Sequence, residues 1–130
     1  EEDLIKELLD RHSEFREKIV EIERKTPRLY ILSLYESIIN NLEALLVPYV
    51  GLAVRKISPF EIIKLAVAKK IITSKEENIV RDLRGVRNQI AHSQFPEDKK
   101  IPEDFLSQVE KILNNLEQSK DNTVDKRKAS

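Results

Sequence analysis

Apolar residues recur every three or four positions along most of this chain, the spacing that places them on one side of an α-helix. Only two glycines and five prolines punctuate the sequence, which favours long helices over turns. We therefore expect an all-α protein. The pattern predicts helices near residues 2–25, 28–47, 59–71, 74–92 and 103–118, with a short helical segment near 48–56.

Two of these helices have a defined start in the sequence. Ser58 is followed by Pro59 and, three residues on, by Glu61, which is the pattern of a capping box with proline at the first helical position. Ser74 and Glu77 repeat the spacing and predict a second capping box.

The segment 28–47 is apolar on most of its sides, as is typical of a helix at the centre of a bundle. One narrow stripe of it is small or polar and contains Ser33, Ser37, Asn40 and Ala44. Small residues at this spacing permit the close approach of another helix, either within the core or from a partner subunit. We expect packing rather than chemistry here, with Ser33, Ser37 and Asn40 at a dimer interface.

The length of the chain fits one domain. We assign residues 1–118 to a helical bundle. Residues 119–130 are polar and charged, and we expect them to form a disordered tail.

Composition limits the possible chemistry. The chain has no cysteine, which excludes disulfides and thiolate metal sites, and its two histidines argue against a structural zinc site. We expect no metal and no cofactor. The formal net charge is zero, so any site for an anion such as nucleic acid must be a local patch.

Nothing in the sequence indicates a membrane protein. The longest apolar run, residues 44–54, contains Pro48 and Gly51 and is too short to span a bilayer. The acidic start of the chain does not resemble a signal peptide. We expect a cytoplasmic protein without membrane insertion by this segment. Because the chain contains no methionine, we also expect it to be part of a longer protein.

The stretch 81–92 combines an apolar face with a second face of different chemistry. The two faces consist of Ile79, Leu83, Val86 and Ile90, and of Arg81, Gly85, Asn88 and His92. Gly85 lies inside a predicted helix, where it costs about 1 kcal/mol relative to alanine. A close neighbour at this glycine, such as a second helix or a substrate backbone, would explain that cost, and we expect Gly85 at the dimer interface.

The residue types of this stretch suit a phosphodiester. Arg87 offers a bidentate fork to phosphate oxygens, and His92 can transfer a proton near neutral pH. Asn88 shares a helix face with His92 and can orient it. No carboxylate cluster accompanies them, which favours metal-free chemistry with the 2′-hydroxyl of RNA as the nucleophile.

Affinity for RNA would then come from nearby cations. Arg81 and Arg84 precede Arg87 at helical spacing, and Lys69 and Lys70 are further candidates.

The sequence from Arg87 to His92 resembles the signature of the HEPN superfamily, the "higher eukaryotes and prokaryotes nucleotide-binding" helical domains. That signature is an arginine, four to six residues, and a histidine, often with a polar residue such as Asn88 directly after the arginine. The likeness is strongest over residues 58–92 and extends more loosely, as a helix pattern, over 4–116.

The resemblance implies an up-and-down bundle of four or five helices that is often a homodimer. In active members two copies of the motif meet in a cleft at the dimer interface and cleave RNA without metal. By this analogy Arg87 stabilises the phosphate charge, His92 is the general acid or base, and Asn88 orients one of them.

Three functions follow from the resemblance. The first is a metal-independent endoribonuclease, as in toxins that pair with a nucleotidyltransferase antitoxin. The second is a non-catalytic dimerisation or interaction module of a larger protein or of a nucleotidyltransferase partner. The third is nucleotide binding for such a partner. Some toxin members carry a tyrosine two positions after the histidine, where this chain has Gln94.

Overall fold

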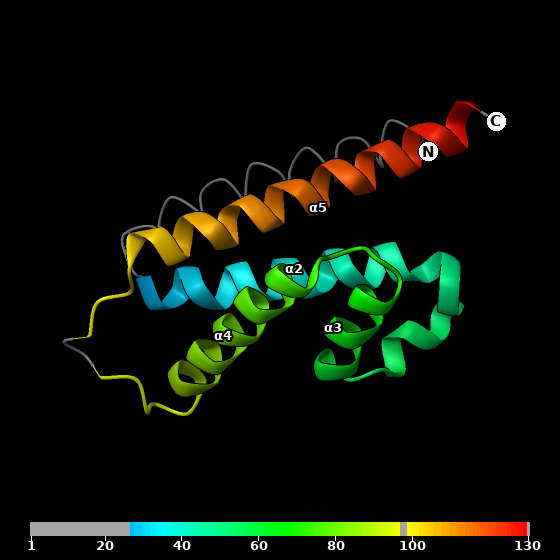
Figure 1. Ribbon diagram of the computed structural model, residues 1–130. Coiled ribbons are helices and arrows are strands. Elements are labelled where there is room, and N and C mark those ends of the chain that lie inside the picture. Colours follow the sequence, from blue (N-terminus) through cyan, green and yellow to red (C-terminus); the bar gives the residue numbers. More distant parts are fainter. Residues whose placement is uncertain (1–26, 97–98, 130) are drawn as a thin grey trace, which may run out of the picture.

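The computed structural model describes residues 27–96 and 99–129, and the side chains of 27–96 and 99–120. In these ranges the chain is an all-α helical bundle without strands, which confirms the expected fold class (Figure 1). Its elements are α2 (Pro27–Val50), the 3-10 helix η1 (Gly51–Lys56), α3 (Pro59–Ala68), α4 (Ser74–Ala91) and α5 (Glu103–Ala129). The helix predicted near residues 2–25 lies outside the described residues.

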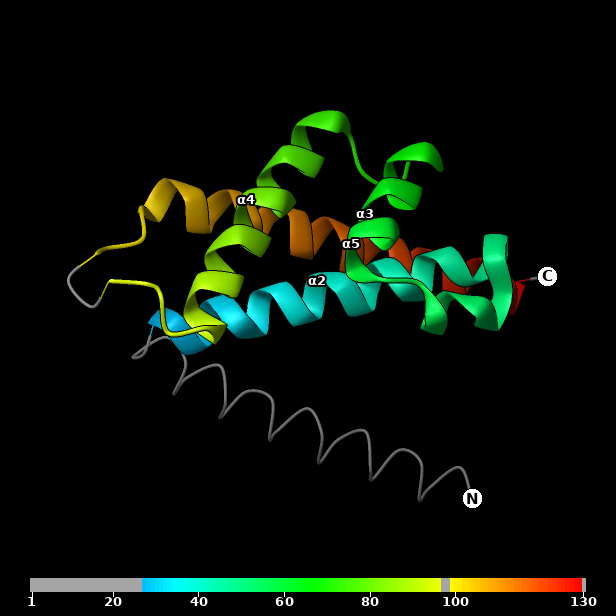
Figure 2. The same cartoon turned by 90° about the horizontal axis from the view of Figure 1, so that it is seen from below.

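Helix α2 is the central element of this bundle and contacts η1, α3, α4 and α5. Figures 1 and 2 show α2 and α5 side by side and running in the same direction, while α4 runs back across them. The short α3 lies in the connection between α2 and α4. The α4–α5 connection therefore lies at the opposite end of the bundle from η1.

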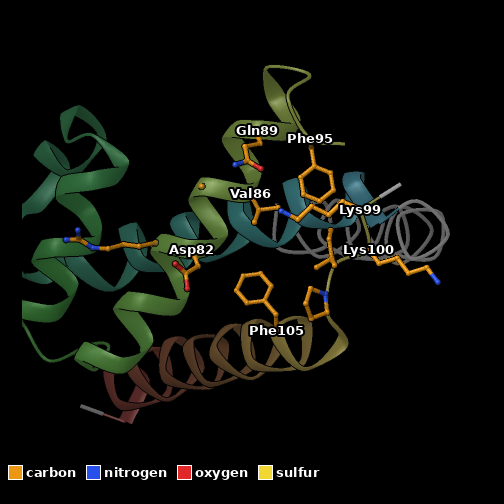
Figure 3. Close-up of a pocket in the computed structure, with 11 residues that line it drawn as sticks. Asp82, Val86, Gln89, Phe95, Lys99, Lys100 and Phe105 are labelled. Atoms are coloured by element: carbon orange, nitrogen blue, oxygen red, sulfur yellow. The ribbon is translucent and has the colours of Figure 1, made fainter. Parts of the chain in front are cut away.

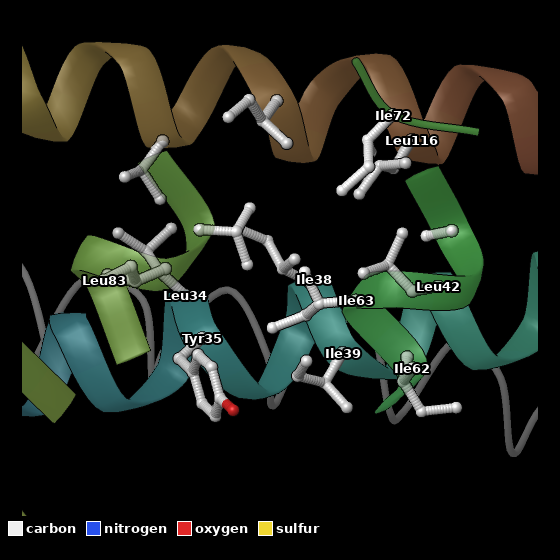
Figure 4. Packing of buried hydrophobic residues seen from close by; sticks show 14 of the residues in the cluster. Leu34, Tyr35, Ile38, Ile39, Leu42, Ile62, Ile63, Ile72, Leu83 and Leu116 are labelled. Carbon is white, nitrogen blue, oxygen red and sulfur yellow. The ribbon is translucent and has the colours of Figure 1, made fainter. Parts of the chain in front are cut away.

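The core is built from the apolar faces of the four α-helices among the described residues (Figure 4). Helix α2 contributes the largest share, with Ile31, Ile38, Leu42 and Leu46 removed completely from solvent. The other helices cover it with Ile62, Ile63, Ala66, Val80, Leu83, Val109, Ile112 and Leu116. Asn41 is the buried polar residue of the described core, and its Nδ2 donates a hydrogen bond to the carbonyl of Ser37 at 2.8 Å. This bond offsets the cost of burying the amide.

Two residues set the end of α2. The sequence predicts an end near Val47, but the helix includes Pro48 and stops at Val50. Proline removes one backbone donor and clashes with the carbonyl of the preceding turn, which weakens the last part of the helix. Gly51 follows with φ +64°, a conformation that glycine adopts without strain. The chain then forms η1, which confirms the short helical segment expected up to Lys56.

The predicted start of α3 is confirmed. Ser58 is the N-cap, its hydroxyl accepts a hydrogen bond from the Glu61 amide at 3.3 Å, and Pro59 takes the first helical position. The helix ends at Ala68, before the expected end at residue 71, because Lys70 has the left-handed φ of 60°. Ile72 nevertheless remains buried in the core.

Helix α4 begins at Ser74, as expected, but the predicted capping box is wrong by one residue. The capping box is formed by Thr73 and Glu76, not by Ser74 and Glu77. The Glu76 amide donates to Thr73 Oγ1 at 3.1 Å, and the Thr73 amide donates to Glu76 Oε1 at 2.9 Å. Both residue pairs have the required spacing, but Thr73 has the extended backbone of a cap while Ser74 is already helical.

Helix α5 continues to Ala129, although the sequence predicted a disordered tail from residue 119. The segment 119–129 contains neither glycine nor proline, so no residue in it breaks the helical backbone. The division of the chain into a domain and a tail at residue 118 stays a prediction.

One stretch, Pro27–Lys56, is long and apolar enough to cross a membrane if only length and composition are considered. The core helix of a soluble protein passes the same test. The absence of membrane insertion stays a prediction.

The register of the α4 cap can be tested by substitution. Thr73→Ala removes one member of the capping box and should lower the free energy of unfolding by about 1 kcal/mol. Ser74→Ala is the matched control and should change it by a few tenths of a kcal/mol at most. Urea denaturation followed by circular dichroism measures both. A larger loss for Ser74→Ala than for Thr73→Ala would contradict the observed register.

Candidate functional site

Three arginines line one side of α4 and form what we call the arginine row: Arg81, Arg84 and Arg87. Residues three apart on a helix are neighbours, so the three side chains follow one another along the surface. All three are half-buried. The helix is fixed in this orientation because Val80 and Leu83 are completely buried in the core.

The first two arginines of the row meet an aromatic ring of α3. The guanidinium carbons of Arg81 and Arg84 lie 5.0 and 5.6 Å from the centroid of the Phe60 ring, and Lys64 Nζ lies 4.8 Å from it. These are distances at which a cation is attracted to the ring. Three cations near one ring create a local positive patch on a chain whose formal net charge is zero.

Arg81 is also held by its own helix. Its Nη2 lies 3.4 Å from Glu77 Oε2, one turn earlier, and forms an ion pair with it. The Arg81 Nε is buried and has no hydrogen-bond partner among the described residues. Arg81 is therefore more constrained than an ordinary surface arginine.

Tyr35 of α2 meets the other two arginines. The Arg87 guanidinium lies 5.7 Å from the centroid of its ring. Burial raises the pKa of the Tyr35 hydroxyl, while the charges of Arg84 and Arg87 and a hydrogen bond with the Arg84 side chain lower it, and burial prevails. Tyr35 is thus a neutral phenol at neutral pH. Figure 4 shows its hydroxyl at the edge of the core, on the side of α2 away from α5.

Arg87 lies beside a surface cavity between α2 and α4. Its Nη1 donates a hydrogen bond to Asn88 Oδ1 at 3.2 Å. The cavity has a volume of about 430 Å³ and is lined by Leu32, Tyr35, Glu36, Ile39, Asn40, Arg87 and Ala91. The structure therefore brings Arg87 and Asn88, both predicted to be catalytic, close to Asn40, which the sequence placed at a dimer interface.

His92 is not part of this cavity. It is the C-cap residue of α4, where its backbone amide donates to the Asn88 carbonyl at 3.0 Å, and it is exposed. It follows Arg87 by five residues, about 7.5 Å along a helix axis. Five residues also turn a helix by about 140°, so the imidazole lies at the helix end on a different side from the Arg87 side chain.

Gly85 opens onto a different cavity, between α4 and the start of α5 (Figure 3). This cavity has a volume of about 470 Å³. In Figure 3 the ring of Phe105 points into it, Lys99 extends toward Val86, and Lys100 points away. A Cβ atom on Gly85 would meet no atom within 4 Å. The close neighbour expected at this glycine is therefore not found within the described residues.

The remaining predicted interface residues lie on α2. Ser33 and Ser37 are half-buried and Asn40 is exposed, and only Asn40 lines the cavity beside Arg87. A dimer interface formed by Gly85, Ser33, Ser37 and Asn40 stays a prediction. Within the part of the chain that the structure describes, no three His, Asp or Glu side chains gather to hold a metal ion.

Sequence reasoning missed Tyr35, Phe60 and Lys64. Tyr35 and Phe60 lie in apolar segments and give no signal beyond hydrophobicity. Only the packing of α2 and α3 against α4 brings these rings to the arginines. The assembled group is a rigid, cationic and aromatic surface with two fixed guanidinium groups near a phenol, which suits the binding of phosphate oxygens.

Gly85→Ala should stabilise the protein. A methyl group meets open space at this position, and alanine is favoured over glycine within a helix by about 1 kcal/mol. Thermal denaturation at low protein concentration measures the effect, and Gln89→Ala, one turn later and exposed, is the matched control. A loss of stability would show that a neighbour outside the described residues, such as a second subunit, occupies the gap.

The buried phenol of Tyr35 predicts a loss of stability at alkaline pH. Its pKa is higher in the folded than in the unfolded chain, so its contribution is complete below the usual tyrosine pKa of about 10 and is lost as the pH rises through the folded value. Above pH ~10, the free energy of unfolding of Tyr35→Phe should therefore fall less steeply with pH than that of the wild type. Tyr49→Phe, at an exposed tyrosine, should retain the wild-type dependence. Equal slopes for wild-type and Tyr35→Phe would contradict the prediction.

Comparison with known proteins identifies no relative: no protein-family model, no curated protein and no solved structure matches this chain.

Proposed function

We propose that this chain is a HEPN-like, metal-independent endoribonuclease that acts as a homodimer. The observation that carries the proposal is the arrangement at the end of α4. Arg87 is held against Tyr35 and Asn88, while His92, on the same helix, is exposed. A fixed guanidinium suits a phosphate group, and an exposed imidazole is accessible to a substrate.

The proposed reaction is a transesterification within the RNA chain. The 2′-oxygen attacks the adjacent phosphorus, its proton passes to a general base, and the bond from phosphorus to the 5′-oxygen breaks. A general acid protonates the leaving 5′-oxygen, so the products are a 2′,3′-cyclic phosphate and a 5′-hydroxyl. Two His92 side chains, one from each copy, would serve as base and acid. Arg87 would stabilise the negative charge that develops on the phosphate oxygens, and Asn88 would orient its guanidinium.

The positive patch supports RNA as the substrate class. Arg81, Arg84 and Lys64 gather around Phe60 next to Arg87, so several cations are available to one nucleic-acid backbone. Such contacts contribute affinity without reading sequence.

The position of His92 supports the proposed dimer. One copy leaves this residue at an exposed helix end, outside the cavity that Arg87 lines. Two α4 helices placed side by side would bring a second imidazole and a second guanidinium to the same phosphate. Gly85, Ser33, Ser37 and Asn40 are the residues proposed to permit this approach.

The second candidate function is a non-catalytic interaction module of a larger protein or of a nucleotidyltransferase partner, such as an antitoxin. The observation that favours it is the engagement of Arg87 within its own chain, by Asn88 and by the Tyr35 ring. In that case the arginine row serves structure or docking. The purified protein would not cleave RNA, and Arg87→Ala would destabilise the fold or dissociate the dimer.

The proposal is tested by RNA cleavage in the presence of EDTA. Wild-type protein should cleave a fluorogenic RNA, and it should leave the same oligonucleotide intact when the nucleotide before the scissile bond is 2′-deoxy. His92→Ala should reduce the rate by about 100-fold or more, the usual contribution of a general acid or base. Because His92 is exposed, the variant should keep the wild-type unfolding curve.

Gln94→Ala is the matched control, because Gln94 is also polar and exposed and lies two residues away. It should retain full activity. Cleavage by His92→Ala at the wild-type rate, with folding intact, would exclude the proposed role of His92. Absence of cleavage by the wild-type dimer, together with dissociation of Arg87→Ala, would favour the interaction module.

A further inference from the structure

The end of the bundle formed by α2 and η1 exposes apolar side chains that the proposed RNase does not use. Within six residues, Val47, Tyr49 and Leu52 are 37%, 56% and 75% exposed. We call these three residues the apolar tip. Scattered exposed hydrophobic residues are ordinary, but three of them at the turn from α2 into η1 make this turn a candidate contact surface.

The backbone holds the apolar tip outward. Pro48 lies in the last turn of α2, and Gly51 turns the chain with φ +64° before η1 begins. Leu52 then lies at the start of η1, while Val54, two residues later, is buried in the core. Burial of Val54 anchors the turn, so Leu52 remains exposed.

Positive charge surrounds the apolar tip. Arg55 and Lys56 form the last turn of η1, and Lys69 and Lys70 follow the end of α3; all four are exposed. We call these four residues the basic collar. Lys69 Nζ lies 5.3 Å from the centroid of the Tyr49 ring, which places the end of α3 at the apolar tip.

The charge of the stretch that forms η1, α3 and the turns on either side of them is almost entirely of one sign. Between residues 44 and 75 the chain has six lysines or arginines and a single acid, Glu61. The whole chain has equal numbers of acidic and basic residues. The excess of positive charge is therefore local to residues 44–75 and favours an anionic partner for this stretch.

We propose that the apolar tip and the basic collar dock this protein onto an anionic membrane surface. The leucine and valine side chains of the tip insert at the boundary between the headgroups and the acyl chains, and the tyrosine ring lies at the depth of the headgroups. The lysine and arginine side chains of the collar contact the anionic headgroups. The three kinds of residue required are present at one end of the bundle, and the α4–α5 connection lies at the other (Figures 1 and 2).

Other occupants fit this surface less well. A second copy docked tip to tip would bring two basic collars together, and their like charges repel. RNA binds through cations and stacked rings, and Tyr49 offers one such ring, but Val47 and Leu52 are aliphatic and offer no stacking face. Insertion of α2 across the bilayer would require Ile38, Leu42 and Leu46 to leave the core. Docking in the interface requires none of these changes.

The absence of tryptophan from the chain allows a direct test. Leu52→Trp places a single tryptophan in the apolar tip of the chain. Its emission should shift to shorter wavelength on addition of phosphatidylcholine vesicles that contain phosphatidylglycerol, and should not shift with phosphatidylcholine alone. Leu29→Trp is the matched control, because Leu29 is 47% exposed near the opposite end of α2, and its emission should not shift. No shift for Leu52→Trp, or an equal shift for both variants, would overturn the proposal.

Sedimentation with the same anionic vesicles separates the contribution of the apolar tip to membrane binding from that of the basic collar. Leu52→Ser should reduce the partition coefficient by about tenfold or more, as expected when a leucine side chain leaves an apolar environment. Lys69→Gln and Lys70→Gln should each reduce it by about fivefold, and Lys111→Gln on α5 should not change it. Binding that does not depend on Leu52 would contradict insertion of the tip. RNA cleavage is not part of either measurement, so the two proposals fail independently.

Discussion

The burial of α2 is the interaction on which the rest of this structure depends. Four of its aliphatic side chains, Ile31, Ile38, Leu42 and Leu46, are completely buried. Complete burial of such a side chain contributes about 1.5–3 kcal/mol. The other described helices are arranged around this one element, and their orientation follows from covering it. The same helix also carries Tyr35, which lies at the margin of the core, so the element that stabilises the fold also contributes to the candidate site.

In the candidate site, neighbouring groups offset the repulsion between the arginines of α4. Positive charges crowd along one side of α4, and like charges at helical spacing repel one another. The rings of Phe60 and Tyr35, the carboxylate of Glu77 and the amide of Asn88 offset this repulsion from neighbouring positions. An arginine held in this way loses less freedom when it binds a phosphate group. This preorganisation is the physical basis for considering α4 a functional surface and not merely a solvated helix face.

Several features of the fold could be predicted because they depend on local chemistry. Ser58 and Pro59 begin α3 as expected, since capping requires only a side chain and the backbone of the next turn. The capping box of α4 was predicted one residue late because Thr73 and Ser74 have equivalent partners at the same spacing, and the sequence offers no means to choose between them. Gly85 was expected to meet a close neighbour, but its surroundings depend on elements far away in the sequence, and it opens onto free space.

The sequence by itself determined the helical class, the central role of α2 and the residue types at the end of α4, because periodicity and composition are properties of neighbouring residues. Only the tertiary structure decided which side chains meet. It placed Phe60 and Lys64 beside Arg81 and Arg84, brought Tyr35 and Asn40 to Arg87, and left His92 exposed. It also exposed Leu52 while burying Val54. These contacts join residues that are distant in the chain, and their geometry follows from how the helices pack around α2, which the spacing of apolar residues does not specify.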